Sequence, residues 1–405
     1  MRAKVKSNII HHDFNPCGGG ERVSFATMQA ISDMDIDFDI TTYAEPNFSR
    51  LINAYGRDLV SIIKKAEKVK IVPSFNESKK ETKKDQYDVH INTHPDLFPY
   101  YQDHFSKDNA IIYCHFPMAN QYIKSRNLEY MRRDLRIKEE DQDDHTETKS
   151  LTANCENIQQ DRCFKETKQC YEKLMTSSTI ITNSEFSRSS ILKMFNGETK
   201  KVHIIRPPVD TETFRNAVLF SASEDEKEED VILVISRINK QKEIENAIML
   251  AKLLKQDDIG NGMMIVGNID YTHDLNYYLS LRKMVGDLGL EDYVTFRTNV
   301  SFDSLLSIMK KAKIYFHPMV GEHFGMAIVE AMAAGLVPIV PSVGGPTEYV
   351  PKKYHFQILE EAADKISSAF CVSNRERIEM SNLVRNFSLS SYIRGFQKVV
   401  QELLP

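Results

Sequence analysis

The chain has 405 residues, of which 41% are hydrophobic and 27% are charged, and its formal net charge is −5. This length exceeds what one ordinary hydrophobic core supports, so we expect two domains. The negative charge argues against a dedicated nucleic-acid-binding protein, whose basic surface normally makes the total positive. No apolar run approaches the roughly 20 residues that a membrane-spanning helix requires.

The cysteines contain no C-x-x-C pair, and three of them lie in a charged stretch with helical character. Reduced thiols are therefore favoured over a zinc site or disulfides. The amino-terminal residues turn polar too soon for a secretory signal peptide, so we expect a cytoplasmic protein that could associate with the cytoplasmic face of a membrane. The six cysteines are Cys17, Cys114, Cys155, Cys163, Cys170 and Cys371.

Short apolar runs alternate with amphipathic helical patterns along the chain, which is typical of βαβ units and parallel sheets. In the first half, strands are predicted at Ser7–His11, Asp39–Tyr43, Val69–Val72, Asp88–Asn92, Ala110–His115 and Thr179–Asn183. In the second half, they are predicted at Val231–Ser236, Met263–Val266, Tyr293–Phe296, Ile314–His317 and Val337–Pro341. Helices are predicted between most of them, for example at Glu21–Ser32, Glu185–Phe195, Glu243–Leu254, Tyr277–Val285 and Ser304–Ala312. The predicted fold class is α/β with two doubly wound, Rossmann-like domains.

The acidic run SASEDEKEED is poor in apolar residues, which indicates an exposed connector between the two domains. We therefore predict an N-terminal domain over residues 1–208, a linker over 209–230 and a C-terminal domain over 231–385. Residues 386–405 are predicted to form a helix that packs back on the N-terminal domain. A charged segment near residues 124–168 is predicted to be a helical insertion in the first domain. Because such sheets bind ligands at the carboxyl ends of their strands, the cleft between the domains is the expected active site.

A run of three glycines follows the first predicted strand, within the segment HHDFNPCGGGERV. Gly18, Gly19 and Gly20 allow the backbone to approach a ligand closely and supply N–H donors that no Cβ obstructs. The alternative is a tight strand-to-helix turn, although such a turn seldom needs three consecutive glycines. Neither the dinucleotide spacing G-x-G-x-x-G nor a P-loop is present. The pattern favours a ligand-binding turn.

A basic cluster in the segment SRINKQK follows the apolar strand VILVI. The positive dipole end of a helix makes cations unfavourable near its N-terminus, so a basic cluster there indicates an anion nearby. The cluster contains Arg237, Lys240 and Lys242. Arginine supplies a planar fork and lysine a point charge, which together suit a diphosphate. A solvated turn is the alternative.

The segment GEHFGMAIVEAMAAG places Glu322 and Glu330 around a Phe324-Gly325 turn that opens a helix. A helix N-terminus offers unpaired N–H groups and a positive dipole end to a phosphate. One glutamate before the turn and another about two helical turns later are placed to reach both ends of a phosphate-linked ligand. The alternative is a packed helix with one exposed carboxylate. The pattern indicates a nucleotide-sugar site.

His115 ends a predicted strand, in the segment YCHFP, where a side chain points toward the expected cleft. A core histidine with its hydrogen bonds satisfied is an equal alternative. No histidine pair has H-E-x-x-H spacing, and no Asp-x-Asp cluster is placed to bind Mg²⁺ with a diphosphate. We therefore expect no metal and no cofactor besides the co-substrate, with Arg237, Lys242 and helix dipoles in place of a metal cation.

Together these motifs resemble those of the retaining GT-B glycosyltransferases of family 4. Glu322 and Glu330 match that family's E-x7-E motif, and Arg237 with Lys242 matches its R-x4-K pair. Within the family, the strings NPCGGGERV, EHFGMAIVEAMAAG and GGP are similar to the α-1,2-mannosyltransferases that extend lipid-linked oligosaccharide from GDP-mannose. The sequence shows no counterpart of their amino-terminal membrane helix, and the charged segment near 124–168 matches no family motif.

The resemblance implies a GT-B fold, with two Rossmann-like domains facing each other across a cleft, and a role for each motif. Glu322 would contact the donor sugar and Glu330 the ribose hydroxyls. Arg237 and Lys242 would hold the donor diphosphate and stabilise it as it leaves. Further donor contacts are implied for the backbone at Phe324, Gly325, Met326, Gly18, Gly19 and Gly20, and His115 would line the sugar site.

The resemblance also implies transfer of a hexose, mannose from GDP-mannose, to a glycan or polyprenyl-linked glycan. Configuration would be retained because the departing phosphate accepts the acceptor's proton on the same face. A UDP-sugar donor, a nucleotide-sugar epimerase and a non-catalytic sugar-nucleotide-binding partner are the alternatives. The basic runs Lys64–Lys70 and Lys79–Lys84 would suit peripheral contact with an anionic membrane, or simply form a solvated surface.

Overall fold

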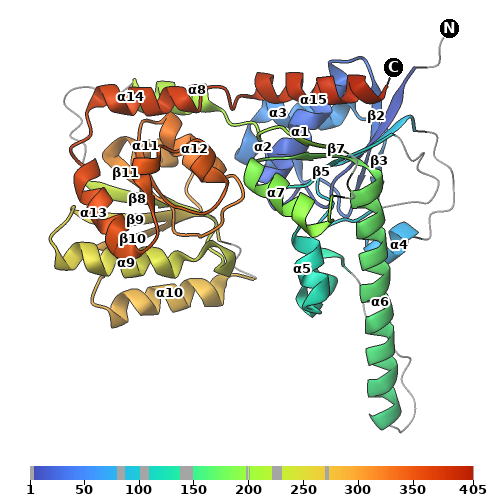
Figure 1. Cartoon of the computed structure of the whole chain (residues 1–405), viewed down its shortest axis with the longest axis horizontal. Coiled ribbons are helices and arrows are strands. Elements are labelled where there is room, and N and C mark those ends of the chain that lie inside the picture. The colour runs from blue at the N-terminus through green and yellow to red at the C-terminus, as the bar shows by residue number, and fades with distance from the viewer. Residues whose placement is uncertain are drawn as a thin grey trace. The chain divides into compact units, whose positions relative to one another are not determined.

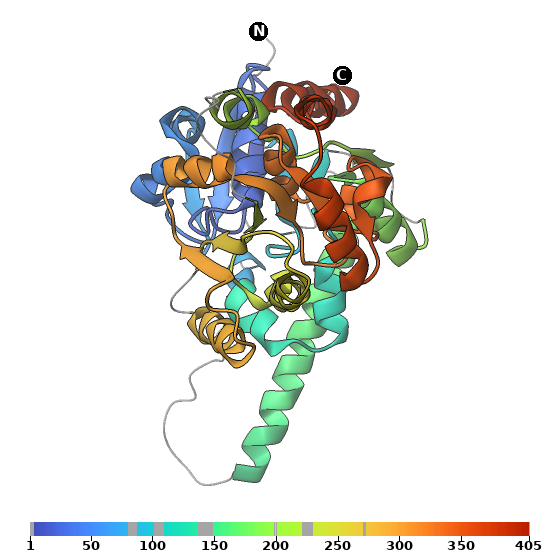
Figure 2. The same ribbon diagram turned by 90° about the vertical axis from the view of Figure 1, so that its left-hand side faces the viewer.

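The computed structural model describes residues 4–79, 87–100, 109–136, 149–197, 199, 201–220, 230–269 and 273–404. The chain forms two compact units (Figures 1 and 2). Unit 1 comprises Met1–Pro207 and Tyr392–Pro405, and unit 2 comprises Pro208–Ser391.

Within the described residues, unit 1 contains a sheet of seven parallel strands in the order β3-β2-β1-β4-β5-β6-β7. The strands are β1 (Lys6–Ile10), β2 (Asp37–Thr42), β3 (Val69–Ile71), β4 (Val89–Asn92), β5 (Ala110–Tyr113), β6 (Thr179–Thr182) and β7 (Lys201–Ile204). The central strand β1 places Ile9 opposite Ile40 of β2 and opposite Ile91 of β4. Strand order reverses between β1 and β4, and such a switch point is where doubly wound sheets bind ligands. All strands except β7 were predicted from the sequence.

Helices cover both faces of the unit 1 sheet, because side chains alternate between the faces along each strand. Ile9 and Tyr113 lie in one core, whereas their neighbours Ile10 and Cys114 lie in the other. The first core contains α1 (Gly19–Ser32), α2 (Phe48–Tyr55), α3 (Arg57–Val60), η1 (Ser61–Lys65) and α15 (Leu389–Leu403). The second contains α4 (Phe75–Lys79), α5 (Met118–Lys124), η2 (Tyr130–Asp134), α6 (Lys149–Ser177) and α7 (Glu185–Met194).

The predicted insertion near residues 124–168 is largely helical where the structure describes it, in the end of α5, η2 and α6. The long helix α6 extends beyond the sheet of its unit (Figures 1 and 2). Its carboxyl-terminal half is anchored: the Tyr171 hydroxyl donates a 2.9 Å hydrogen bond to the buried Asp96 carboxylate. Residues 137–148 of the predicted insertion lie outside the described residues.

Unit 2 contains, among its described residues, a sheet of six parallel strands in the order β10-β9-β8-β11-β12-β13. The strands are β8 (Val231–Ile235), β9 (Gly262–Gly267), β10 (Val294–Thr298), β11 (Ala312–Phe316), β12 (Val337–Pro341) and β13 (His355–Phe356). The helices are α8 (Thr211–Phe214), η3 (Arg215–Leu219), η4 (Lys240–Lys242), α9 (Ile244–Gln256), α10 (Leu275–Asp287), α11 (Phe302–Lys311), α12 (Met326–Ala333), η5 (Gly345–Glu348), η6 (Lys352–Tyr354), α13 (Leu359–Ala369) and α14 (Asn374–Leu383). The switch point of this sheet lies between β8 and β11.

Two predicted domain limits differ from the structure. Residues 209–219, predicted as linker, belong to unit 2, because α8 and η3 place Phe214 and Val218 in its core. The acidic run at 221–229 lies outside the described residues. Unit 2 also extends past residue 385 to Ser391, and α15 joins unit 1 from Tyr392 onward. There, the Tyr392 hydroxyl lies 2.7 Å from Thr27 Oγ1 of α1.

Across the described parts of the chain, we find no helix with both the length and the apolar composition that a membrane span needs.

Candidate functional site

The predicted cation and carboxylate meet in unit 2, beside the switch point of its sheet. Lys242 ends η4 in the loop after β8, and Glu322 lies in the loop after β11. Nζ of Lys242 is 2.6 Å from Oε2 of Glu322, and the two side chains are only 22% and 12% exposed. The basic cluster predicted an anion nearby. One anion beside this cluster is the carboxylate of the chain's own Glu322.

Glu322 is held in its charged form by several neighbours. The His323 N–H donates a 3.0 Å hydrogen bond to Oε1, and His317 Nε2 lies 3.5 Å from Oε2. Burial alone would raise the pKa of the Glu322 carboxyl, but the Lys242 charge and then His317 hold it well below its usual range. Burial lowers the pKa of His323 to about 4, so this ring is neutral near pH 7. The site therefore contains a fixed ion pair.

Two glycines after β12 position the backbone of Glu322. The Gly345 N–H donates a 2.8 Å hydrogen bond to the Glu322 carbonyl, and Gly344 pairs with Glu322 as an isolated parallel bridge. A Cβ on Gly344 would lie 2.6 Å from the Glu322 carbonyl oxygen, and one on Gly345 would lie 2.0 Å from the His323 carbonyl oxygen. The absence of a side chain at these two glycines therefore allows a close approach to the chain's own Glu322 loop.

The Phe324-Gly325 turn opens α12 as predicted. Gly325 is the N-cap with φ +83°, and a Cβ there would lie 2.5 Å from the Ile328 Cδ1 atom. The first helical hydrogen bonds of α12 run from the Ile328 and Val329 N–H groups to the Gly325 carbonyl, so the amides of Met326 and Ala327 precede them at the helix N-terminus. The Tyr349 hydroxyl donates a hydrogen bond to the carbonyl of the buried Phe324 and fixes the turn.

Glu330 lies on α12 and is partly buried. Burial and, next, the negative charges of Glu322 and Glu330 raise the pKa of the Tyr315 hydroxyl well above its ordinary value. The negative charges of Glu322 and Glu330 therefore both disfavour ionisation of the Tyr315 hydroxyl on β11. Arg237 is different: its side chain is exposed and makes no ion pair or hydrogen bond with the described residues.

The glycine turn of unit 1 begins α1. Gly18 is the N-cap, and its N–H donates to the Glu21 carboxylate, while the Tyr55 hydroxyl donates a 2.6 Å hydrogen bond to the Gly18 carbonyl. Gly19 is exposed and is the first residue of the helix. Glu21 therefore satisfies an amide that the start of a helix would otherwise leave unpaired.

His115 lies next to this turn, partly buried just after β5. Its Nε2 is 3.2 Å from the Thr93 carbonyl oxygen, and its ring centroid is 5.0 Å from that of His94. A Cβ on Gly20 would lie 3.1 Å from His94 Cδ2 and 3.6 Å from His115 Nε2. The structure thus brings together the predicted glycines and His115 within unit 1.

Sequence reasoning gave no role to several residues at these two sites. In unit 1 they are His11, His12, Glu21 and His94, and in unit 2 they are Tyr315, His317 and His323. The signal that selected His115, a polar side chain just past a strand's carboxyl end, applies equally to His11 and His317. The contact between Glu21 and His11 could not be predicted from the sequence, because the two residues lie on opposite sides of the glycine turn.

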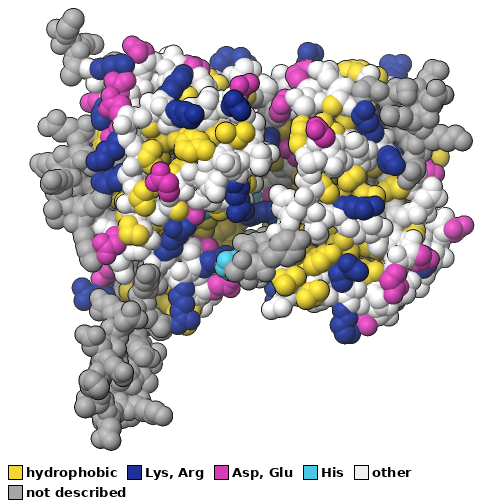
Figure 3. Space-filling model, turned by 180° about the vertical axis from the view of Figure 1, so that it is seen from behind, with side chains coloured by type: hydrophobic (Ala, Val, Ile, Leu, Met, Phe, Trp, Pro, Cys, Tyr) yellow, Lys and Arg dark blue, Asp and Glu magenta, His cyan; other side chains and the backbone are white. Residues whose placement is uncertain are grey.

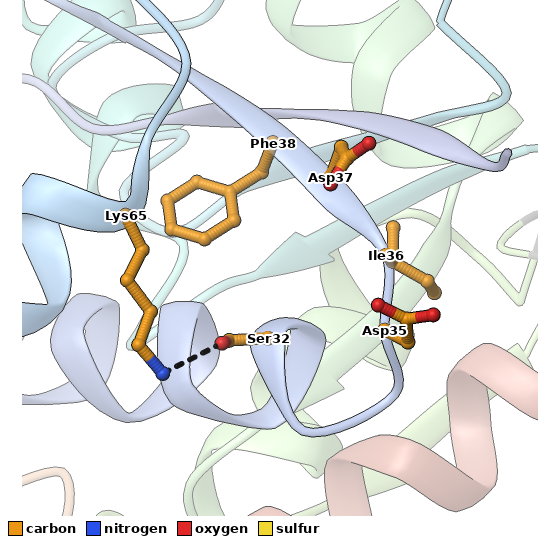
Figure 4. Close-up of a pocket in the computed structure, with 6 residues that line it drawn as sticks. All are labelled: Ser32, Asp35, Ile36, Asp37, Phe38 and Lys65. Atoms are coloured by element: carbon orange, nitrogen blue, oxygen red, sulfur yellow. Dashed lines mark hydrogen bonds between the residues drawn. The ribbon is translucent and has the colours of Figure 1, made fainter.

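A shallow pocket of about 160 Å³ lies elsewhere in unit 1 (Figure 4). It is lined by residues at the end of α1 and the start of β2, where Lys65 Nζ donates a 3.0 Å hydrogen bond to Ser32 Oγ. This is the amino end of β2, opposite the edge where parallel sheets bind ligands, so we do not assign it a catalytic role.

Residues 218–370 match the family described as "Glycosyl transferases group 1". This match covers less than half of the chain. The matched region lies within unit 2 and includes the Lys242–Glu322 pair, Arg237 and Glu330.

Several proteins similar in sequence to this chain carry the name GDP-Man:Man(3)GlcNAc(2)-PP-Dol alpha-1,2-mannosyltransferase. The protein of Dictyostelium discoideum is 30% identical over 149 residues, which cover 35% of this chain and 29% of that protein. The Neurospora crassa protein is 26% identical over 219 residues, covering 48% and 39%. The human protein is 32% identical over 112 residues, covering 26% and 23%. Each match therefore spans less than half of the relative's length.

Solved structures share the fold over nearly the whole chain. A glycosyltransferase from Rickettsia africae ESF-5 has a TM-score of 0.64 at 13% identity, covering 100% of this chain and 99% of that one. Anabaena Alr3699/HepE in complex with UDP has a TM-score of 0.65 at 14% identity, covering 98% and 100%. At these identities the likeness concerns the fold alone. The α/β fold predicted from the sequence, GT-B with two Rossmann-like units, is confirmed.

Proposed function

We propose that the protein is a retaining family 4 glycosyltransferase that moves mannose from GDP-mannose to a lipid-linked glycan. The observation that carries this proposal is the partly buried Lys242–Glu322 pair, which lies at the carboxyl edge of a parallel sheet within the region that matches the group 1 family. The donor and acceptor are inferred from the names of the similar proteins, which the chain matches over a minority of their length.

The donor diphosphate would bind at Lys242. An ammonium group has three hydrogen-bond donors. Glu322 accepts one and the Met319 sulfur accepts a second at 3.7 Å, so one remains for a phosphate oxygen. The exposed guanidinium of Arg237 would supply a planar fork to the same anion. The first amides of α12 would add donors and a positive dipole end. Glu322 would then have two roles, because it would fix Lys242 and contact the donor sugar. Glu330 would bind the ribose hydroxyls.

The reaction breaks the bond between the anomeric carbon and the diphosphate oxygen and forms a bond from that carbon to an acceptor hydroxyl oxygen. Negative charge builds on the leaving diphosphate, so cations placed in advance at that position lower the barrier. The departing phosphate would take the proton of the acceptor hydroxyl on the same face of the sugar, which retains configuration. No metal ion or side-chain base enters this scheme. The donor contacts predicted for Gly18, Gly19, Gly20 and His115 of unit 1 stay predictions.

The donor is tested by thermal stabilisation, since a ligand that binds only the native state raises its apparent stability. GDP-mannose, UDP-glucose and UDP-N-acetylglucosamine are each titrated against the wild type, Lys242→Ala and the control Lys283→Ala, a lysine in an exposed ion pair on α10. We expect a saturable shift with GDP-mannose for the wild type and Lys283→Ala only. A shift with a UDP-sugar alone contradicts the donor assignment, and an equal shift in Lys242→Ala contradicts the site.

The reaction type is tested with polyprenyl-linked glycan acceptors. We expect an α-linked product only when donor and acceptor are both present, with the anomeric configuration read by NMR. A β-linked product would contradict retention. Conversion of the donor sugar without acceptor would identify an epimerase, and tight donor binding without any turnover would identify a non-catalytic partner.

The acceptor would be reached by peripheral attachment to the cytoplasmic side of a membrane. The described basic residues available for this include Lys64 and Lys65, whereas the side chains of Lys79–Lys84 lie outside the described residues. On the face that Figure 3 shows, Lys and Arg are interspersed with Asp and Glu, so attraction to anionic lipid would be modest. Flotation with anionic liposomes tests this, and a protein that stays entirely in solution contradicts it.

A further inference from the structure

Two histidines and one glutamate form a compact buried cluster beside the glycine turn of unit 1. His11 and His12 directly follow β1, and Glu21 lies in the first turn of α1. One nitrogen or oxygen atom from each side chain lies within 4.8 Å of the others. The exposed fractions of His11, His12 and Glu21 are 0%, 8% and 3%. The cluster belongs to unit 1, whereas the Lys242–Glu322 pair belongs to unit 2.

Two ring nitrogens of this cluster, His11 Nε2 and His12 Nδ1, have no hydrogen-bond partner among the described residues. Buried polar atoms without partners are uncommon, because each costs free energy that a partner would recover. His11 Nε2 lies 3.6 Å from Glu21 Oε1, which is too long for a hydrogen bond. The other oxygen of Glu21, Oε2, accepts the Gly18 N–H. One carboxylate oxygen and two ring nitrogens thus remain for a ligand.

The hydrogen bonds around His11 orient its ring. Nδ1 of His11 lies 2.9 Å from Thr93 Oγ1, and the Thr93 hydroxyl donates to the Ile10 carbonyl at 3.1 Å. With its proton directed to Ile10, Thr93 Oγ1 accepts from Nδ1–H, which leaves the Nε2 lone pair on the side of Glu21. Without a bound cation, this tautomer would place the Nε2 lone pair of His11 facing the negatively charged Glu21 carboxylate, which is unfavourable. Metal-binding histidines use the same arrangement, in which the second ring N–H donates to an outer partner.

We propose that His11 Nε2, His12 Nδ1 and Glu21 Oε1 bind a divalent transition-metal ion of the Zn²⁺ class. Two imidazoles and one carboxylate form a ligand set that Zn²⁺ accepts, with a fourth position left for water. Tetrahedral bonds of about 2.0–2.2 Å place neighbouring ligand atoms roughly 3.4 Å apart. The 3.6 Å separation of His11 Nε2 and Glu21 Oε1 is close to this value. The three side chains offer ligand atoms within 4.8 Å of one another, and binding would draw them closer.

The bound ion would tie the end of β1 to the first turn of α1 and so hold the glycine turn between them. The sequence did not predict this site, because the spacing H-H-x8-E is not a known metal motif and the ligands meet only through the turn. The site would be structural, and its ligands are different residues from those proposed to hold the diphosphate in unit 2.

The test uses the full chain purified without chelators or metal-affinity resin. Elemental analysis should find one Zn²⁺ per chain, or the chelator-stripped protein should bind one Zn²⁺ in competition with a chromophoric chelator. His12→Gln and Glu21→Gln should weaken binding at least about a hundred-fold, since even outer-partner changes cost 10–100-fold. Glutamine at position 21 can still accept the Gly18 N–H, so α1 should remain capped. The control His203→Gln removes a histidine 4.0 Å from Glu402 and should leave Zn²⁺ affinity unchanged.

Thr93→Val leaves all three ligands in place and should weaken Zn²⁺ binding 10- to 100-fold. Circular dichroism identifies any variant that fails to fold. In that event, the visible spectrum of Co²⁺ added to the wild type decides, since tetrahedral histidine ligation gives intense bands. The proposal is overturned if the wild type binds neither metal, or if His12→Gln leaves affinity unchanged. Protonation of both His11 ring nitrogens, seen by ¹⁵N NMR in metal-free and Zn²⁺-treated protein alike, would show an ion pair with Glu21 instead.

Discussion

Removing one partner of the Lys242–Glu322 pair should destabilise unit 2 more than any exposed ion pair does. The two atoms are 2.6 Å apart and both side chains are largely shielded from solvent. A charge-assisted hydrogen bond contributes about 1.5–3 kcal/mol, and stranding a fully buried charge costs about 3–5 kcal/mol. Lys242 is 22% exposed and Glu322 keeps the His323 N–H, so we expect about 2–3 kcal/mol for Lys242→Gln or Glu322→Gln.

The coupling between the two residues separates this pair from other effects of the substitutions. In a double-mutant cycle followed by urea denaturation, the double variant should be less destabilised than the sum of the singles, by about 1.5–3 kcal/mol. In thermal unfolding, each single variant should lower Tm by about 4–12 °C, from 2–4 °C per kcal/mol for a unit of this size.

The exposed pair Lys283–Asp287 on α10 is a matched control. Its Nζ–Oδ2 distance is also 2.6 Å, but its side chains are 75% and 61% exposed. The same cycle there should give a coupling below about 0.5 kcal/mol. A coupling of that small size at Lys242–Glu322 would refute the argument that burial makes this pair strong.

Three further predictions concern the framework around the sites. Gly345→Ala should lower the stability of unit 2 by about 1–3 kcal/mol in urea titration, because the added Cβ would clash with the His323 carbonyl oxygen. The control Gly286→Ala, within helix α10, should be neutral or stabilising in the same titration. Burial raises the pKa of Asp96 to about 6, so its contribution to stability is full below the ordinary value of 3.8 and is lost as pH rises through 6. Unfolding free energy should therefore fall by on the order of 1 kcal/mol more between pH 5 and pH 8 in the wild type than in Asp96→Asn, and equal slopes would contradict this. Phe396→Ala should cost unit 1 about 3–5 kcal/mol, because the ring is fully buried in its core, and a loss below 1 kcal/mol would show that α15 is not needed there.

The sheets could be predicted from the sequence because their central strands are continuous apolar runs, such as VILVI of β8. The edge strands β7 and β13 could not, since β7 is partly exposed and β13 has only two residues. The start of unit 2 was also missed. Phe214 and Val218 supply its apolar contacts, but the acidic run that follows dominated the local composition.

At the sites, local motifs could be predicted and long-range partners could not. The turn before α12 and both of its glutamates follow from one short segment. Nothing local shows that Lys242 pairs with a carboxylate 80 residues away, or that His11 Nδ1 meets a hydroxyl 82 residues away. These contacts arise because neighbouring parallel strands place their carboxyl ends at one edge of the sheet.

Calorimetric titration of GDP-mannose into the wild type, Lys242→Ala and Lys283→Ala tests the central claim most directly. We predict saturable binding of one donor per chain to the wild type and to Lys283→Ala, and affinity about 10- to 150-fold lower for Lys242→Ala, equivalent to about 1.5–3 kcal/mol. Undiminished affinity in Lys242→Ala, or no saturable binding to the wild type, would contradict the claim that this partly buried lysine holds a sugar nucleotide.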